Sequence, residues 1–241
     1  AISVIATTQS AATFLGGPDQ GYRGNYTYLA ATIASVLGSI FVARILIPRF
    51  YALKATTVYE FLRDRYGESA MKAAGAMYIL GRFFASGARL YLAAIAISMI
   101  LFSNINAENI IISSLIMVMI GFGVTFLGGI RSIIWTDLLQ FCMYVFSAVA
   151  ILYFLLNTIP LSYSEISNAL SETPEGVNKL LLFEFGVDMA APYSVISIFT
   201  GLTLLFIASF GLDQDISQRL LTCKKDHEGG NALIISALIG I

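Results

Sequence analysis

The sequence predicts an all-α protein that crosses a membrane several times. Of its 241 residues, 57% are hydrophobic and only 12% are charged, whereas a soluble domain carries about 25% charged residues. A membrane-spanning helix needs about 20 mostly apolar residues. Five stretches meet that length, and a shorter apolar stretch lies at each end of the chain: 26–48, 71–101, 108–127, 132–158 and 191–218, with partial spans at 1–16 and 230–241.

The first partial span is unusually polar. Hydroxyl or amide side chains occupy five of the seven positions from Thr7 to Thr13, and such side chains offer the backbone alternatives to helical hydrogen bonds. A helix that is locally unwound beside a cavity leaves carbonyls free to bind a cation. A serine- and threonine-rich helix packed against its neighbours is the simpler alternative. The sequence Gly16-Gly17-Pro18 predicts the end of this helix.

A short amphipathic segment follows the second apolar stretch. Residues 56–67 contain too many charged and polar side chains to span a membrane, so they predict a short helix on the membrane surface. Thr56 or Thr57 is its expected N-cap, with Glu60 in the first turn.

Two arginines lie inside the third long stretch. Arg82 and Arg89 are seven residues apart and therefore lie on one helical face. Ala85 and Ser86 belong to the same face, and small residues mark places where membrane helices pack closely. We expect both arginines to face the interior of the bundle. Binding a ligand and tying the helix to backbone carbonyls or to Asp137 are the two alternatives for each.

Asp137 is the acidic residue of a stretch that is otherwise fit to cross a membrane. A carboxylate at that depth is unfavourable by about 2.5–3.5 kcal/mol on insertion scales, so it usually faces a wet cavity, a partner or an ion. The residue types alone therefore mark Asp137 as a candidate functional residue.

The basic residues predict the orientation of the chain in the membrane. Residues 159–189, which contain Pro160 and Pro174, form the one long polar loop. With alternating spans, ten basic residues fall on one side and only Arg23 and Lys179 on the other. Positively charged loops are usually cytoplasmic, which places residues 159–189 on the extracellular or periplasmic side. The ten are Arg44, Arg49, Lys54, Arg63, Arg65, Lys72, Arg131, Arg219, Lys224 and Lys225.

Several classes of function are disfavoured by the composition. A net charge of −1 gives no reason to expect a nucleic acid partner. Cys142 and Cys223 are far apart, and His227 lies in a charged segment, so neither a metal site nor a nucleophile with its base is predicted. We therefore expect neither an enzyme nor a bound cofactor. A channel is also disfavoured, because the polar residues cluster near the middle of the spans instead of forming a continuous stripe.

Four segments together resemble the sodium:solute symporter family. The most characteristic contains Gly128-Gly129, Trp135-Thr136-Asp137 and Gln140, and the others match the family in order and spacing across nearly the whole chain. These three are Ser10-x-x-x-Phe14-Leu15-Gly16 with Gly21-Tyr22, Thr57-Val58-Tyr59-Glu60-Phe61-Leu62-x-x-Arg65-Tyr66-Gly67, and Gly211-x-Asp213-Gln214-x-x-x-Gln218-Arg219-Leu220.

The resemblance implies a fold of two inverted repeats of five helices each, as in leucine-transporter-like proteins. Residues 1–241 would then form one transmembrane domain fragment. Core helices one to five of the first repeat would occupy about 1–158, the outer loop 159–189, and helix six with the start of helix seven about 190–241. The remaining helices would belong to the rest of the same polypeptide.

The resemblance also implies a Na⁺ site and a solute site. The backbone carbonyls of Ala6 and Gln9 would hold Na⁺ as the coupling ion, and Asp137 matches the aspartate that the family uses for cation coupling. Thr8, Ser10 and Thr13 would line the break in the first helix. Family members with an arginine in the third helix include carriers of acidic sugars such as sialic acid. Arg89 is therefore the first candidate, and Arg82 the second, to grip a carboxylate.

Two acidic residues, Asp213 and Asp215, lie near the end of the sixth span. Asp213 corresponds to a polar position near the inner gate of the family, where it either contacts solute or is structural. Asp215 and Arg219 are four residues apart, so an exposed ion pair between them is expected.

The expected function is symport of Na⁺ with a small polar solute that carries a carboxylate, such as an acidic sugar, an organic acid or an amino acid. Coupling to H⁺ is an alternative, since oxygen ligands favour Na⁺ without excluding H⁺. A membrane sensor that binds solute without net flux is another. The expected partners are Na⁺, a small solute and the lipid bilayer.

Overall fold

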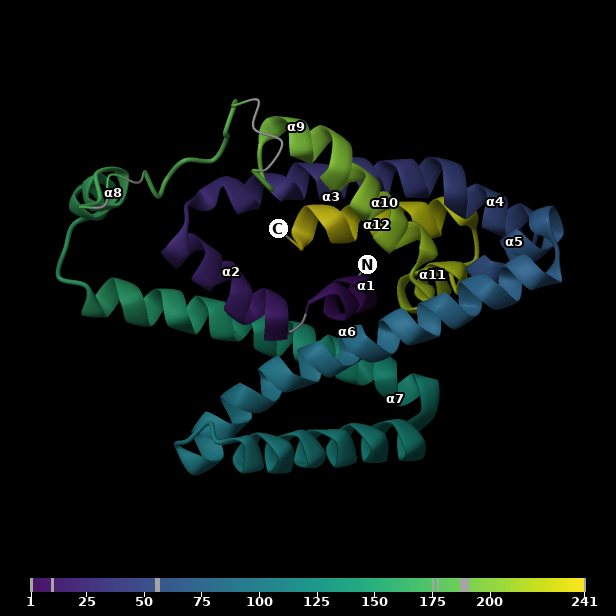
Figure 1. The fold of residues 1–241 in the computed structure, drawn as a ribbon, viewed down its shortest axis with the longest axis horizontal. Helices are drawn as coiled ribbons and strands as arrows, with labels where there is room; N and C mark the ends of the chain where they lie inside the picture. The colour runs from purple at the N-terminus through teal and green to yellow at the C-terminus, as the bar shows by residue number, and fades with distance from the viewer. Residues whose placement is uncertain are drawn as a thin grey trace.

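The computed structural model describes residues 2–9, 11–54, 57–174, 176, 178–186 and 191–240. Within these ranges the chain is almost entirely helical and forms no β-sheet (Figure 1). Five helices are long and apolar enough to cross a membrane: Tyr26–Ala52, Glu68–Phe102, Ala107–Val124, Trp135–Thr158 and Val195–Leu212. The predicted all-α polytopic membrane fold is thus confirmed.

The first half of the chain begins with two short helices. These are α1 (Ile2–Thr8) and α2 (Ala11–Arg23). The next span joins η1 (Tyr26–Ala30), α3 (Ala31–Phe41), the π-helical turn η2 (Val42–Leu46) and α4 (Ile47–Ala52). It is followed by α5 (Val58–Tyr66) and α6 (Glu68–Phe102).

The second half begins with α7 (Ala107–Thr158), whose two membrane-spanning stretches run in opposite directions in Figure 1. After α8 (Tyr163–Ser171), one span consists of α9 (Val195–Ser197), the π-helical turn η3 (Ile198–Leu202) and α10 (Thr203–Leu212). The last two helices are α11 (Gln214–Leu221) and α12 (Asp226–Ile239).

Helix α2 corrects one prediction, because it continues through Gly16, Gly17 and Pro18 to Arg23. Proline removes one backbone donor and usually ends or kinks a helix. Here, however, an ion pair between Asp19 and Arg23, four residues apart at 2.8 Å, supports the turn that follows Pro18. Ending the helix at Pro18 would forgo this pair and the hydrogen bonds of the last turn, whereas continuing it loses one backbone donor.

The end of the sixth span also differs from the prediction. The apolar pattern extends to residue 218, but α10 ends at Leu212 and α11 begins at Gln214. Asp213 separates them with an extended backbone (φ −71°, ψ 117°), and its side chain accepts a hydrogen bond from the N–H of Asp215 at 2.9 Å. This N-cap makes a new helix start more favourable than continuation of the old one.

The surface segments partly agree with the sequence. Helix α5 forms where a surface helix is expected, with Glu60 in its first turn. The Thr57 side chain makes no cap hydrogen bond, and Thr56 lies outside the described residues.

The segment 159–189 is not wholly a loop, because it contains α8. A capping box at the start of α8 joins Ser162 and Glu165, and these hydrogen bonds lower the pKa of the Glu165 carboxyl.

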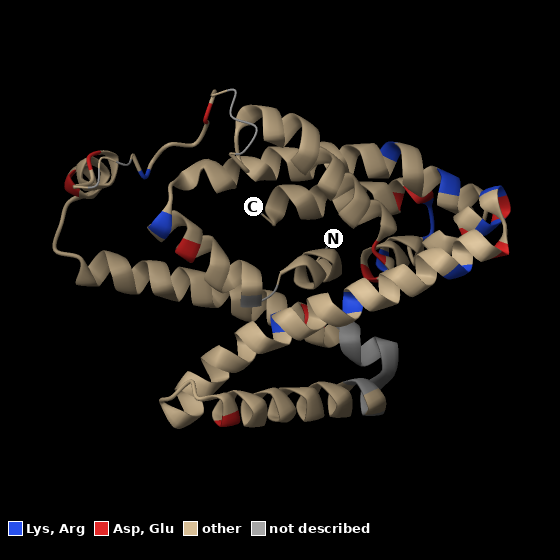
Figure 2. Cartoon of the chain, viewed as in Figure 1, with Lys and Arg blue, Asp and Glu red and all other residues tan. Residues whose placement is uncertain are grey.

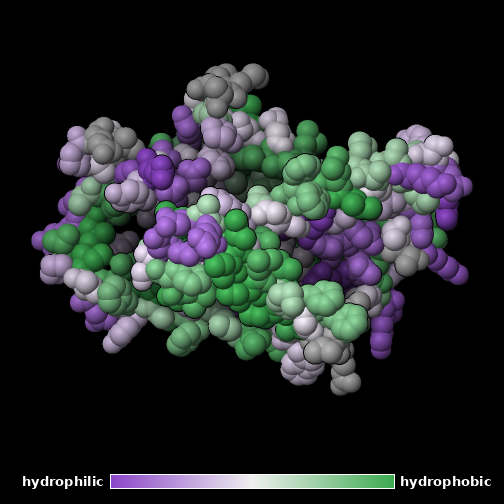
Figure 3. Space-filling model, turned by 60° about the horizontal axis from the view of Figure 1, so that its bottom comes forward, coloured by the Kyte–Doolittle hydropathy of each residue, from purple (hydrophilic) through white to green (hydrophobic). Residues whose placement is uncertain are grey.

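The buried core lies where α1, η2, α4, α10, α11 and α12 meet. Its largest fully buried members are Ile47, Leu220 and Leu233, and Val4 of α1 packs with them. Helices α6 and α7 lie against each other and expose many apolar side chains. Figure 3 shows a broad apolar band across the middle of the molecule, with hydrophilic residues toward both ends. Apolar outer faces are expected where the surrounding medium is hydrocarbon.

Gly38 allows α3 and α10 to approach closely. A Cβ atom at Gly38 would lie 2.8 Å from the Cβ of Phe206 and 3.1 Å from the backbone nitrogen of Ile207. We expect Gly38→Ala to lower the free energy of unfolding of the full-length protein by about 1–3 kcal/mol, the usual effect of overpacking. Thermal unfolding in detergent measures this. Gly75→Ala is the matched control, because nothing lies within 4 Å of that position, and equal destabilisation by both would contradict the prediction.

Charged residues separate toward the two ends of the molecule. Figure 2 shows most Lys and Arg residues at the end formed by α4, α5 and α11, and few at the opposite end beside α8. At that opposite end, the Nζ atom of Lys179 donates a hydrogen bond to the carbonyl oxygen of Tyr22 at 2.6 Å, next to Arg23. Arg23 and Lys179, the two basic residues that the alternating spans place on the other side from the ten, therefore lie close together.

Candidate functional site

The first helix is interrupted between α1 and α2. Helix α1 ends at Thr8, Gln9 is not helical, and α2 begins at Ala11; we call this interruption the α1–α2 break. The hydroxyls near it are bound locally, because Thr8 Oγ1 donates to the carbonyl oxygen of Ile5 at 2.9 Å and Thr13 Oγ1 donates to Gln9 Oε1 at 3.1 Å. Gln9 thus connects the two halves of the interrupted helix.

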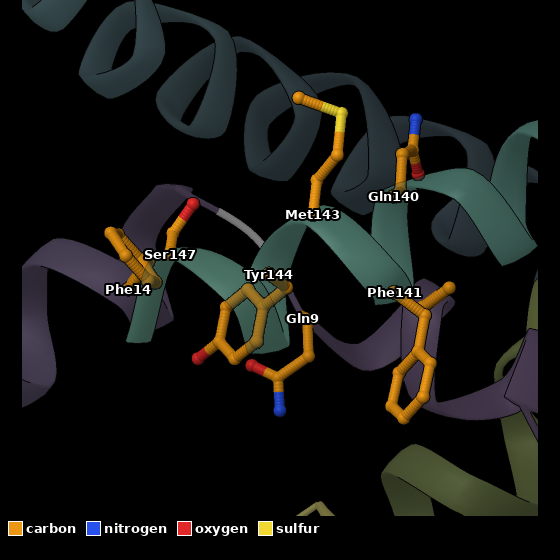
Figure 4. A pocket seen from close by; sticks show the side chains of 8 residues that line it. Gln9, Phe14, Gln140, Phe141, Met143, Tyr144 and Ser147 are labelled. Atoms are coloured by element: carbon orange, nitrogen blue, oxygen red, sulfur yellow. The ribbon is translucent and has the colours of Figure 1, made fainter. Parts of the chain in front are cut away.

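A cavity of about 360 Å³ lies between the α1–α2 break and α7 (Figure 4). The first helix contributes Ala6, Gln9 and Phe14 to its wall. Five residues of α7 complete the wall: Gln140, Phe141, Met143, Tyr144 and Ser147. The Phe14 and Tyr144 rings meet edge to face, with centroids 5.0 Å apart. The cavity is therefore mostly apolar, with a few hydrogen-bonding groups in its wall.

A second cavity, of about 230 Å³, lies on the other side of the break. Thr8, Gln9 and Thr13 line it, together with residues from η1, α3, α10 and α12: Tyr28, Ala31, Thr32, Ser35, Phe206, Ser236, Ala237 and Gly240. The Nε2 atom of Gln9 points across it to the carbonyl oxygen of Gly240, 3.5 Å away. Many of its lining groups are hydroxyls or amides, so this cavity suits a small polar solute or an ion.

Asp137 lies on α7 and is 7% exposed. Its Oδ2 atom accepts a hydrogen bond from Ser3 Oγ of α1 at 2.6 Å and one from Arg219 Nη2 of α11 at 3.2 Å. Arg219 Nε also donates to Ser3 Oγ at 2.9 Å. The three side chains, which we call the Ser3–Asp137–Arg219 cluster, connect three helices that are far apart in the sequence.

Arg82 forms a second group of charges with α11. Its guanidinium pairs with Asp213 at 3.3 Å and with Asp215, and Tyr78 Oη donates to Asp213 Oδ1 at 3.2 Å. Asp215 therefore pairs with Arg82, and the expected Asp215–Arg219 ion pair is wrong. Arg219 Nη1 donates instead to the backbone carbonyl of Asp215, at 3.0 Å. We call Arg82, Asp213 and Asp215 the Arg82 cluster.

Tyr59 of α5 lies beside the Arg82 cluster. Its hydroxyl donates to the carbonyl oxygen of Leu212 at 3.3 Å, where α10 ends. Burial, with smaller effects of Tyr78, Asp213 and Asp215, raises the pKa of Tyr59 to about 12. The phenol therefore stays protonated and remains a hydrogen-bond donor at neutral pH.

The comparisons with known proteins agree on a family. The model of the sodium:solute symporter family matches residues 1–241. The chain belongs to that family. Its members are transporters and not enzymes, and the five apolar helices agree with a multi-pass membrane protein.

Individual relatives of this symporter chain are distant but match over nearly all of it. Human sodium-coupled monocarboxylate transporter 2 is 28% identical over 243 residues, covering 98% of the chain, and human sodium-coupled monocarboxylate transporter 1 is 25% identical, covering 100%. The human sodium/iodide cotransporter is 23% identical, covering 98% of the chain. The chain spans only 37%, 38% and 35% of the length of these three relatives.

The residues predicted to bind ion and solute lie in separate parts of the structure. Ala6, Thr8, Gln9 and Thr13 gather around the α1–α2 break, whereas Ser10 lies outside the described residues. Asp137 lies beside α1 and α11, and Arg82 and Asp213, both predicted to bind solute, pair with each other. Arg89 is exposed on α6 and is not among the residues that line these cavities.

The polar face of α7 is the part that sequence analysis missed. Gln140, Tyr144 and Ser147 follow Asp137 by three, seven and ten residues, a spacing that places all four on one helical face. That signal was available in the sequence. The roles of Ser3 and Arg219 depend on contacts between distant segments, which no local pattern shows.

Proposed function

We propose that the whole protein is a secondary active transporter that couples the entry of Na⁺ to that of a small solute carrying a carboxylate. Membership of the sodium:solute symporter family supports the transport class and the ion. The observation that carries the proposal is the α1–α2 break, which borders two cavities while Asp137 lies buried nearby. A broken helix beside a cavity is the usual site of substrate and ion in transporters.

The cation would be held by oxygen atoms near the α1–α2 break. We assign the backbone carbonyls of Ala6 and Gln9 to this role, because hard monovalent cations prefer oxygen ligands. The Asp137 carboxylate, which lies apart from the break beside α1 and α11, would supply a second cation position with a compensating charge. H⁺ is the second candidate for the coupling ion, because oxygen ligands favour Na⁺ without excluding H⁺. No bound cofactor is part of the proposal.

An anionic solute is supported by the names of the relatives. Two transport monocarboxylates and a third transports iodide, according to those names. The residues that line the cavities of this chain add neutral hydrogen-bonding groups, namely Thr8, Thr13, Gln140, Tyr144 and Ser147. A solute that combines one carboxylate with a small apolar part would suit the mostly apolar cavity on the α7 side.

In the proposed transport cycle, Na⁺ stabilises the conformation that binds solute well, and the solute stabilises Na⁺ binding by the same amount. Such reciprocal coupling is typically about 1–3 kcal/mol. We place the basic end of the molecule in the cytoplasm and residues 159–189 outside. Residues 1–158 would form the first inverted repeat, and residues 190–241 helix six with the start of helix seven.

The proposed function is tested with the full-length protein in liposomes. Uptake of a labelled simple monocarboxylate, sialic acid and proline is measured under an inward Na⁺ gradient, an inward H⁺ gradient or no gradient. We expect Na⁺-driven uptake of at least one carboxylate that exceeds uptake of zwitterionic proline. Uptake driven by H⁺ alone would replace Na⁺ in the proposal, and binding without gradient-driven uptake would favour a sensor.

Arg89→Ala tests whether this arginine binds the solute or serves as a structural tie of its helix. If its guanidinium grips the solute carboxylate, the KM for that solute rises by about 10–100-fold, since a hydrogen bond to a charged group contributes about 1.5–3 kcal/mol. Kinetics of uptake measure this change. Arg63→Ala is the matched control, because Arg63 pairs only with exposed Asp64 on α5. An unchanged KM in Arg89→Ala would leave solute recognition to the residues around the α1–α2 break.

A further inference from the structure

We propose that Ser3 and Asp137 form a cation site that Arg219 closes, so that the coupling cation must displace the guanidinium to bind. This inference rests on the proposed role of Asp137 as a cation ligand. It adds a ligand, Ser3, and a competitor, Arg219, that the resemblance to the symporter family does not supply.

The Ser3–Asp137–Arg219 cluster has the geometry of a compact cation site. Ser3 Oγ and Arg219 Nη2 both bind the same carboxylate oxygen, Oδ2 of Asp137, at 2.6 and 3.2 Å. Arg219 Nε simultaneously donates to Ser3 Oγ at 2.9 Å. One guanidinium thus contacts both oxygen atoms that we assign as cation ligands, and one of them belongs to a residue that is only 7% exposed.

Charge makes simultaneous binding unfavourable. A guanidinium has only donors and cannot act as a ligand to a metal cation. Two like charges about 4 Å apart repel each other strongly where the surroundings screen less than bulk water does. A cation that binds Asp137 Oδ2 beside Arg219 would meet this repulsion, whereas the hydroxyl of Ser3 would regain a free lone pair once Arg219 moved away. Cation and guanidinium therefore compete for the same two oxygen atoms.

Displacement of Arg219 would also alter how the helices are held. Arg219 belongs to α11, and its contacts to Ser3 and Asp137 join α11 to α1 and α7. Its Nη1 atom remains close to the carbonyl oxygen of Asp215 within α11, at 3.0 Å. A displaced guanidinium therefore has a partner in its own helix. Cation binding would break the two interhelical hydrogen bonds of Arg219 and keep the intrahelical one, which couples the ion to movement of α11.

The competition predicts opposite effects for two substitutions in the full-length protein. Arg219→Gln removes the competing charge, so the Na⁺ concentration for half-maximal uptake is expected to fall by about tenfold, within the usual range of about 5–150-fold for coupled sites. Ser3→Ala removes a ligand, so the same concentration is expected to rise. Arg219→Lys keeps the charge and should stay close to the wild type. Uptake into liposomes and the Na⁺-dependent shift of Tm in detergent are measured for each protein.

Tyr51→Phe is the matched control for loosening of α11. Tyr51 Oη donates to the carbonyl oxygens of Leu220 and Cys223 at 2.9 and 2.8 Å, so its removal weakens the end of α11 without touching Asp137. We expect its Na⁺ dependence to match the wild type. An equal shift in Tyr51→Phe and Arg219→Gln would overturn the competition, as would a half-maximal Na⁺ concentration that is unchanged or raised in Arg219→Gln.

The two readouts separate this inference from the proposed function. If wild-type protein shows no Na⁺-driven uptake, the proposed function fails, yet a Tm shift that needs less Na⁺ in Arg219→Gln would still support the competition. If Arg219→Gln does not fold, Ser3→Ala decides the matter, and an unchanged Na⁺ dependence in that variant overturns the inference. Na⁺ dependence that survives unaltered in Asp137→Asn would overturn this inference and the assignment of Asp137 as a cation ligand, while Na⁺-driven symport itself would stand.

Discussion

Asp137→Asn is expected to weaken the stimulation of solute uptake by Na⁺ strongly while leaving the protein folded. Asparagine keeps the shape of the side chain and can still accept a hydrogen bond from Ser3, whose hydroxyl lies 2.6 Å from the present carboxylate oxygen. It removes the negative charge. Because that charge is the compensating partner of any cation bound there, Na⁺ affinity should fall steeply.

The size of this effect follows from the burial of Asp137. A unit charge about 4 Å from a cation contributes about 4 kcal/mol at an effective dielectric constant of about 20, and Asp137 is only 7% exposed. If half of this interaction remains after solvent screening, the half-maximal Na⁺ concentration rises by about thirtyfold. Titration of liposome uptake with Na⁺ measures the change.

Asp19→Asn provides the control for charge removal in general. Asp19 pairs with Arg23 at 2.8 Å on an exposed part of α2, where the two side chains are 54% and 77% exposed. Exposed pairs of this kind contribute about 0–1 kcal/mol, so Na⁺ dependence should be unchanged. Normal Na⁺ stimulation in Asp137→Asn would show that the coupling cation binds elsewhere.

The long spans could be predicted because hydrocarbon imposes a simple rule on sequence. Apolar length alone locates the five helices, and the predicted and observed bounds differ by a few residues at most ends. The two larger errors concern Pro18 and Asp213. Helix α2 continues through Pro18, where an ion pair between Asp19 and Arg23 supports the following turn, and the side chain of Asp213 starts a new helix.

The candidate site was predictable where it depends on one helix and not where it depends on several. The dense hydroxyl and amide side chains near Gln9 predicted an interrupted helix, and α1 and α2 are indeed separate. The partners of charged residues were not predictable. Arg219 has an acidic residue four positions away, yet it pairs with Asp137, 82 residues distant, because Asp215 is taken by Arg82.

Both groups of paired charges converge on α11. The Arg82 cluster joins α11 to α6, and the Ser3–Asp137–Arg219 cluster joins it to α1 and α7. Meanwhile Ile216 and Leu220 of α11 lie in the core with Val4 and Leu233. Since apolar packing tolerates small shifts that a directional ion pair does not, these charged contacts are the ones that a movement of α11 must break.

Arg82→Ala is expected to destabilise the protein more than any other single arginine substitution on α6. The Arg82 side chain is 29% exposed and neutralises two carboxylates, those of Asp213 and Asp215, which are 22% and 40% exposed. Its removal leaves two like charges close together, and Asp213 then keeps only neutral donors, the Tyr78 hydroxyl and the backbone N–H of Asp215. Breaking a buried pair costs about 3–5 kcal/mol; with partial exposure, we expect a loss of about 1–3 kcal/mol in the free energy of unfolding.

Arg82→Ala combined with Asp215→Asn tests the cause of this loss. If repulsion between unpaired carboxylates destabilises α11, removing one charge should recover at least half of the lost stability, as measured by thermal unfolding of the full-length protein in detergent. Arg89→Ala, seven residues along α6 and exposed, should unfold like the wild type. If Arg82 instead serves chiefly to bind solute, Arg82→Ala would retain its stability and raise KM, and Asp215→Asn would restore nothing. The same pair of variants therefore decides whether Arg82 holds the helices together or binds the solute.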